Sequence, residues 1–181
     1  MKYWRLIVFV LVALAQLAVP ASLVWKREQT LGRGSVWKFR TAPVDPVDVF
    51  RGRYVALHFE VETQEIAPPA NASSGQAVFV TLKTNAEGFA EIDQVATSKP
   101  AGYDFMEARL LGTTVSLPFD KYWVTERDAP AAETAYRNLS RRGNQNAYVT
   151  VRVFRGDAAI EQLYLDNQPL GEYLRQSPTA K

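Results

Sequence analysis

The sequence predicts a mainly β domain of the α+β class behind an N-terminal transmembrane helix. We expect a curved antiparallel sheet or partly closed barrel with one covering helix. Three observations lead to this prediction: the run 6–24 has no charged side chain, most of the later chain consists of short alternating segments between turn residues, and one segment, 129–142, has a helical period. The expected divisions are an anchor over 1–27, an extracytoplasmic domain over 28–176 and a tail over 177–181.

The run 6–24 is long enough to cross a lipid bilayer. As a helix it would span about 28 Å, close to the roughly 30 Å thickness of the hydrocarbon core. Aromatic rings prefer the headgroup level, and three lie just outside the run, namely Tyr3, Trp4 and Trp25. The alternative is a cleaved signal peptide, because small residues precede a possible cut after Ala21.

Charge at the two ends of this run predicts its orientation. Lys2 and Arg5 precede it, whereas Lys26 and Arg27 are partly offset by Glu28. Positive residues favour the cytoplasmic side. We therefore expect the N-terminus inside, and the domain in the periplasm or outside, at a bacterial cytoplasmic (inner) membrane.

Composition excludes several functions. The chain has 21 Lys and Arg against 19 Asp and Glu, and Lys2 and Arg5 account for the whole excess, so nucleic acid is not an expected partner. The absence of cysteine removes disulfides, thiolate catalysis and sulfur-ligated zinc. His58 is the only histidine, so histidine metal clusters are impossible. We expect no cofactor.

Alternation and turn residues predict the strands. In the segment 53–61, four apolar side chains fall on one face, Val55, Leu57, Phe59 and Val61. Val78, Val80 and Leu82 should likewise point into the core. The expected strands and strand segments are 35–40, 53–61, 77–83, 89–95, 105–111, 113–117, 121–125, 146–154 and 158–165, with a bulge or bend at Gly112.

The helical segment 129–142 carries recognisable end signals. Asp128 can cap its N-terminus, Pro130 is tolerated in the first turn, and Gly143 can end it in the left-handed conformation. Its apolar positions follow the helical period, so this face should pack on the sheet: Ala132, Ala135, Tyr136 and Leu139.

Three blocks of the sequence resemble the GDYXXLXY family of membrane-anchored bacterial proteins. They are PVDPVDVFRGRYVALHFEV, LPFDKYWVTERDAPAAETAYR and VTVRVFRGDAAIEQLYLDNQPL. The corresponding motif positions are Pro43, Asp45, Pro46, Arg51, Gly52, Tyr54, Leu57, Phe59 and Glu126.

The chain departs from the family name at Arg53, where the family has aspartate, and at Phe59, where it often has tyrosine. The first departure reverses charge, so an acid/base, metal or ion-pair role for that aspartate cannot operate here. The resemblance also implies a polytopic integral membrane protein as a partner.

The motif residues have a structural and a functional interpretation. Asp45 and Asp48 could fasten the turn by accepting backbone hydrogen bonds, with Arg51 paired to a carboxylate, and this reading is favoured. Alternatively, Arg51 and Tyr54 recognise an anion. For His58, a partly solvated strand position is favoured over a general base.

A hydrolase is the alternative to an interaction protein. Glycoside hydrolysis needs two carboxyl groups, and Glu126 with Asp104 or Glu107 is the candidate pair. Asp128 and Glu133 are explained by the cap and by the helix dipole. Aromatic residues could also line a peptide or glycan groove: Trp37, Tyr54, Tyr103, Tyr122, Trp123, Tyr148 and Tyr164. We expect that this chain is not an enzyme and that it is an accessory or interaction subunit of a polytopic inner-membrane protein.

Overall fold

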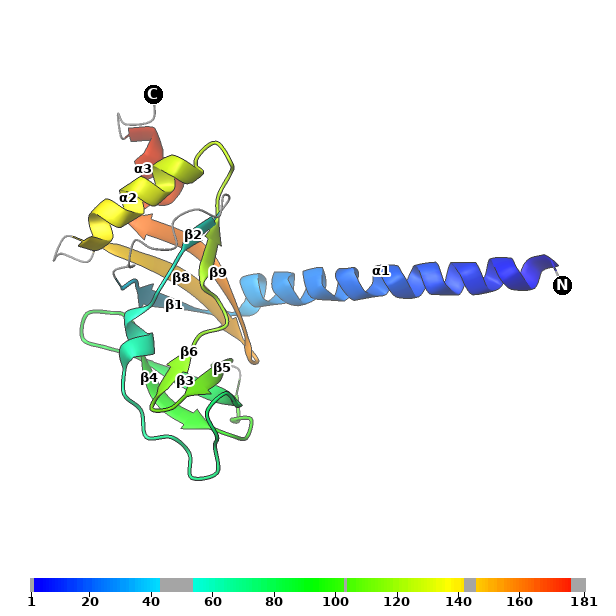
Figure 1. Cartoon of the computed structure of the whole chain (residues 1–181), viewed down its shortest axis with the longest axis horizontal. Helices are drawn as coiled ribbons and strands as arrows, with labels where there is room; N and C mark the ends of the chain where they lie inside the picture. Colours follow the sequence, from blue (N-terminus) through cyan, green and yellow to red (C-terminus); the bar gives the residue numbers. More distant parts are fainter. Residues whose placement is uncertain (1, 43–53, 103, 142–145, 177–181) are drawn as a thin grey trace.

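The structure is a computed structural model of the chain, and it describes residues 2–42, 54–102, 104–141 and 146–176 (Figure 1). A long helix, α1 (Lys2–Arg33), leads into the first strand, β1 (Ser35–Arg40). In Figure 1, α1 projects from the β domain as a stalk with the N-terminus at its far end. The helix is long and apolar enough to cross a membrane, as the sequence predicts, and it continues beyond residue 27.

Antiparallel sheets form the domain, which confirms the predicted fold class. The first sheet has the order β1-β8-β9-β10, the second β4-β3-β5-β6, and β2 pairs with β7. The strands are β2 (Tyr54–Ala56), β3 (Ala77–Thr84), β4 (Ala90–Ala96), β5 (Phe105–Leu111), β6 (Thr114–Ser116), β7 (Lys121–Trp123), β8 (Ala147–Phe154), β9 (Asp157–Leu165) and β10 (Gln168–Pro169).

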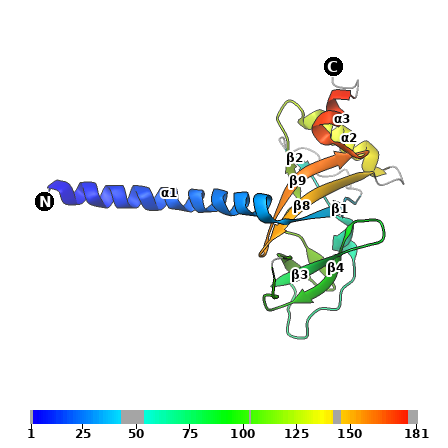
Figure 2. The ribbon, with the colours of Figure 1, turned by 180° about the vertical axis from the view of Figure 1, so that it is seen from behind.

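Two helices lie together over one end of the first sheet, α2 (Ala129–Arg141) and α3 (Leu170–Gln176) (Figures 1 and 2). Ala132 and Tyr136 of α2 are buried, and Ala135 and Leu139 pack against the core, so the predicted apolar face of this helix is confirmed. Residue 142, the expected end of the helix, and Gly143 lie outside the described residues.

The apolar faces of the strands make one core. Val78, Val80 and Leu82 are buried as predicted. The strands β3 and β4 form a hairpin, and so do β8 and β9. The bridge between Met106 and Gly156 joins the tip of the β8–β9 hairpin to β5, and thereby links the first sheet to the second.

The prediction of a continuous strand over 53–61 is wrong, although its burial pattern is correct. Within the described part of this segment, residues 54–61, only Tyr54–Ala56 is a strand, and a 3₁₀ helix follows over Glu60–Thr63. The Glu62 carboxylate accepts hydrogen bonds from the Phe59 N–H at 3.3 Å and the Leu117 N–H at 2.9 Å. These contacts bind the chain after Phe59 to the end of the β6 region, so the backbone turns instead of extending.

Two further predictions differ in detail from the structure. The bulge or bend expected at Gly112, which has a φ of +63°, is a tight hairpin turn between β5 and β6, because Leu111 pairs directly with Thr114. The strand expected over 121–125 ends at Trp123. Its end has a local cause, since the Thr125 carbonyl accepts the N–H groups of Asp128 and Ala129 and begins the turn into α2.

The junction between α1 and β1 is tightly packed. Thr30 is only 2% exposed, and the Gly34 N–H donates to its carbonyl at 2.9 Å. A Cβ on Gly34 would lie 2.5 Å from that carbonyl and 3.0 Å from the Val153 carbonyl. The Arg152 guanidinium donates to the Gly34 carbonyl at 3.2 Å. The last turn of the helix is therefore part of the folded domain.

Candidate functional site

The motif residues are only partly within the described structure. Residues 43–53 lie outside it, and so do the predictions made for them: the turn fastened by Asp45 and Asp48, the two interpretations of Arg51, and the positions Pro43, Pro46, Gly52 and Arg53. The described motif positions are Tyr54, Leu57, Phe59 and Glu126, and they fall into three different environments.

Leu57 and Phe59 belong to the core. Each is 1% exposed, and the Leu57 N–H donates to the Asp120 carbonyl at 2.8 Å. The Phe59 ring packs edge-to-face on Phe39 at 5.9 Å and on Phe119 at 5.2 Å, while Phe39 and Phe119 lie 5.5 Å apart. This trio joins β1, the motif segment and the chain before β7. At these two positions the motif serves packing.

Tyr54 is half-buried instead, on the strand pair β2–β7. Its ring meets the Trp123 ring edge-to-face at 5.4 Å, and the Lys121 ammonium lies 5.3 Å from the Tyr54 ring centre. Trp123 is 65% exposed. We refer to Tyr54, Lys121 and Trp123 as the aromatic patch. A large exposed tryptophan beside a tyrosine and a cation has the chemistry of a protein-contact surface.

The neighbour of this patch on the same strand faces inward. Tyr122 is half-buried, and burial raises the pKa of its hydroxyl, while hydrogen bonds with Leu163 and Gln162 act in the opposite direction. The alternation of β7 thus places Tyr122 against β9 and leaves Lys121 and Trp123 outside. Lys121 was not among the residues expected from the sequence to form a site, because the three residues of β7 carry too little periodicity to place it beside Tyr54.

Tyr136 on α2 fixes the helix against the chain that leads from β1. Its hydroxyl donates to the Ala42 carbonyl at 3.4 Å, and burial raises the pKa of Tyr136 to about 12. Thr41 is also buried, and its hydroxyl donates to the Ala147 carbonyl at 2.9 Å. The Ala42 N–H donates to the His58 carbonyl. His58 therefore contributes its backbone to this junction, while its side chain is exposed.

A second group of aromatic residues lies on the outer face of the first sheet. Tyr148 and Tyr164 stack at 4.8 Å with nearly parallel rings, and burial raises the pKa of Tyr148, with a smaller contribution from Tyr164. Arg40 lies over Phe89 and pairs with Glu87. The aromatic residues expected to line one groove are thus dispersed. Tyr148 and Tyr164 lie on this face, Tyr54 and Trp123 belong to the aromatic patch, Tyr122 faces β9, and Trp37 packs against the core. Tyr103 is outside the described residues.

Glu126 is exposed in the turn that precedes α2. In the same turn the Thr125 hydroxyl donates to the Asp128 carboxylate at 2.7 Å, and the Asp128 carbonyl accepts the Ala132 N–H. On α2, Glu133 pairs with Arg137. Asp128 and Glu133, two of the acidic residues considered for hydrolysis, thus have local structural contacts that explain their presence.

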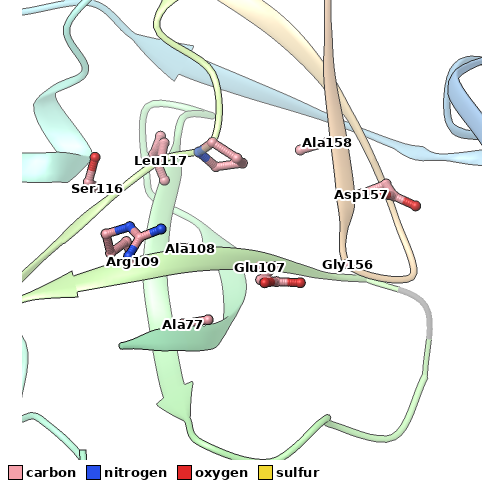
Figure 3. A pocket seen from close by; sticks show the side chains of 10 residues that line it. Ala77, Glu107, Ala108, Arg109, Ser116, Leu117, Gly156, Asp157 and Ala158 are labelled. Carbon is pink, nitrogen blue, oxygen red and sulfur yellow. The ribbon is translucent and has the colours of Figure 1, made fainter. Parts of the chain in front are cut away.

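An open pocket of about 350 Å³ lies between β5, the chain after β6 and the β8–β9 hairpin (Figure 3). Its acidic residues are Glu107 and Asp157, and Glu126 does not line it. In Figure 3 the Asp157 side chain points outward, and its carboxylate lies 3.9 Å from the Lys26 ammonium. The Arg109 guanidinium donates to the Gly75 carbonyl at 2.7 Å and so holds the loop that precedes β3.

Metal binding has no candidate among the described residues, since no three His, Asp or Glu side chains there form a group that could hold an ion.

The comparisons with known proteins give one match. The family model described as GDYXXLXY protein matches residues 16–163, which is most of the chain. Neither a curated protein nor a solved structure matches it.

Proposed function

Because the chain belongs to the GDYXXLXY protein family, we propose that it is a membrane-anchored, extracytoplasmic β domain that acts by protein interaction, as an accessory subunit of a polytopic inner-membrane protein. The residues 6–24 cross the bilayer, the N-terminus stays inside, and the domain stands outside the cytoplasmic membrane. The partner is bound through the aromatic patch, Tyr54, Lys121 and Trp123.

The exposed Trp123 carries this proposal. Tryptophan and tyrosine are enriched at the energetic centres of protein interfaces, because they provide large contact area at a low cost in side-chain entropy. Tyr54 is a motif position, yet unlike Leu57 and Phe59 it is not buried. A motif tyrosine that the core does not use is available for a partner.

The rigid junction at Gly34 supports the same function. Since the last turn of α1 packs into the domain, the domain has a fixed orientation relative to the helix. A partner fixed in the same membrane would then meet the aromatic patch at a defined height and angle. Such preorganisation lowers the entropic cost of association.

Affinity capture of the intact membrane form tests the proposal. We expect Trp123→Ala and Tyr54→Ala to fold normally and to lose a polytopic membrane protein that the wild-type chain retains. Leu111→Ala is the matched control, because Leu111 is an exposed apolar residue at the β5–β6 turn. Capture of no membrane protein by the wild type, or equal capture by all four proteins, would contradict the proposal.

The positions of the acidic residues do not support a hydrolase. It needs Glu126 and a second carboxylate on either side of one scissile bond. Of Glu126, Asp104 and Glu107, only Glu107 lines the pocket. The Asp104 carboxylate accepts a hydrogen bond from the Ser35 hydroxyl, and Arg109, two residues from Glu107, is engaged with Gly75.

A further inference from the structure

The membrane-spanning part of α1 contains very few polar side chains. Within the run 6–24 these are Gln16 and Ser22. The Ser22 hydroxyl donates to the Val19 carbonyl at 2.7 Å and is thereby satisfied within its own helix. The Gln16 side chain is exposed, and it makes no hydrogen bond within the described part of the chain. An amide that offers two donors and one acceptor oxygen is thus left on the lipid-facing surface.

Gln16 lies too deep in the run to reach water. It is separated from the nearer end, Val24, by about 12 Å of helix at 1.5 Å per residue. That distance is longer than a glutamine side chain, so the amide cannot extend to the headgroups as a lysine near the end of a helix does. An unpaired amide in hydrocarbon costs several kilocalories per mole, and this cost favours a partner that supplies hydrogen bonds.

Pro20 removes the usual helical donor of a backbone carbonyl at the same height. It lies inside α1, and proline has no backbone N–H. The carbonyl that an N–H at this position would bind belongs to Gln16, four residues earlier. One residue therefore presents two N–H donors on its side chain and two acceptor oxygens, one on the side chain and one on the backbone.

We propose that α1 pairs with α1 of a second copy of this chain, in parallel, through reciprocal hydrogen bonds of Gln16. This inference rests on the part of the proposed function that places α1 across the membrane. Two copies with the same topology place their Gln16 residues at equal height around a two-fold axis. The two N–H donors of each Gln16 amide then meet the side-chain and backbone oxygens of Gln16 in the other copy. The polar groups of one helix are therefore complementary to the same groups of its partner.

The helical period defines the rest of the contact face. Positions three, four or seven residues from Gln16 lie on its side of the helix. These include Phe9, Val12 and Leu23, whereas Leu14 lies nearly opposite. The two copies would pack apolar side chains along this face, with the Gln16 pair near its centre.

Single-cysteine cross-linking of the full-length chain in membranes tests the inference, and the chain has no native cysteine. Val12→Cys reports on the contact face, and Leu14→Cys is the matched control at almost the same depth. We expect Val12→Cys to form a disulfide-linked dimer on oxidation and Leu14→Cys to form little. Adding Gln16→Leu to Val12→Cys should lower the association about fivefold or more, and Gln16→Asn should retain part of it.

Carbonate extraction of the same samples separates this inference from the proposed function. The pairing is wrong if the protein stays in the membrane pellet but Val12→Cys and Leu14→Cys cross-link equally. It is also wrong if Gln16→Leu has no effect on cross-linking. In both cases the assignment of α1 as a membrane anchor is retained. A Val12→Cys product whose mass is not twice that of the chain would also overturn the second copy as partner. If carbonate releases the protein, the membrane span fails and the pairing fails with it.

Discussion

The Tyr136 hydroxyl connects α2 to the edge of the first sheet, and its pKa makes this connection sensitive to alkaline pH. Its pKa rises from 10.0 to about 12 in the folded state because burial disfavours the phenolate. The unfolded chain keeps a value near 10. The stability gained from this shift is therefore complete below about pH 10 and is lost as the pH rises from about 10 to 12.

Tyr136→Phe should remove this pH dependence. Between about pH 8 and pH 11 we expect the free energy of unfolding of the wild type to fall by about 1 kcal/mol more than that of the variant. At neutral pH the variant should lose about 1 kcal/mol, because it removes a long hydrogen bond to the Ala42 carbonyl and the contacts of the hydroxyl with Thr41 and His58. Urea unfolding followed by tryptophan fluorescence measures both quantities. Parallel pH curves for the two proteins would contradict the assignment.

Two glycines near the end of α1 allow a matched comparison. A Cβ on Gly34 would meet the Thr30 carbonyl at 2.5 Å, whereas a Cβ on Gly32 would meet nothing within 4 Å. We expect Gly34→Ala to destabilise the domain by about 2 kcal/mol or more through displacement of β1 from the helix. Gly32→Ala should be neutral or stabilising by up to about 1 kcal/mol, since alanine favours helix. Equal thermal stability of the two variants would show that the junction tolerates a side chain.

At the scale of the element, the motif segment combines packing positions with one surface position. Leu57→Ala should cost about 2–5 kcal/mol, because it empties a site in the core that is 1% exposed. Tyr54→Ala should cost about 1 kcal/mol or less, because it removes mainly the contacts with Trp123 and Lys121. Chemical denaturation of both variants measures this difference. Similar losses of stability in the two variants would contradict the assignment of Leu57 to the core and of Tyr54 to a contact surface.

The same segment shows which features the sequence could predict. Alternation identified Val55, Leu57, Phe59 and Val61 as buried because the side-chain period reports the face that meets the core. It could not predict that the strand ends at Ala56. That end depends on the Glu62 carboxylate, which binds the Leu117 N–H far along the chain. A contact between residues so distant in sequence leaves no periodic signal.

The candidate site was less predictable than the fold. Tyr54 was identified from the motif, but the exposure of Trp123 depends on which face of the short strand β7 meets β9, and three residues carry too little periodicity to decide it. The stacked pair of Tyr148 and Tyr164 depends on the register of the β8–β9 hairpin. In both cases side chains meet across strands, and the register that aligns them is set by tertiary packing.

At the scale of the whole molecule, the helix and the domain are joined without a flexible linker. The Gly34 N–H is bonded to Thr30, and β1 begins at the next residue, paired from its first position with Val153. The tip of the β8–β9 hairpin lies beside the base of the helix, where Asp157 reaches Lys26. That ion pair is exposed and 3.9 Å long, so it contributes little to stability, and the packed junction determines the orientation.

The expected topology follows from the charges around the helix and can be tested with the same cysteine-free background. Residue 3 precedes the apolar run, and Thr97 is an exposed residue of the domain. In intact spheroplasts we expect a membrane-impermeant maleimide to label Thr97→Cys and to leave Tyr3→Cys unlabelled until the membrane is permeabilised. The reason is that a short tail with Lys2 and Arg5 is retained on the cytoplasmic side, while the domain follows the span to the other side. The reverse labelling pattern would place the aromatic patch in the cytoplasm, and a partner would then have to bind it from that side.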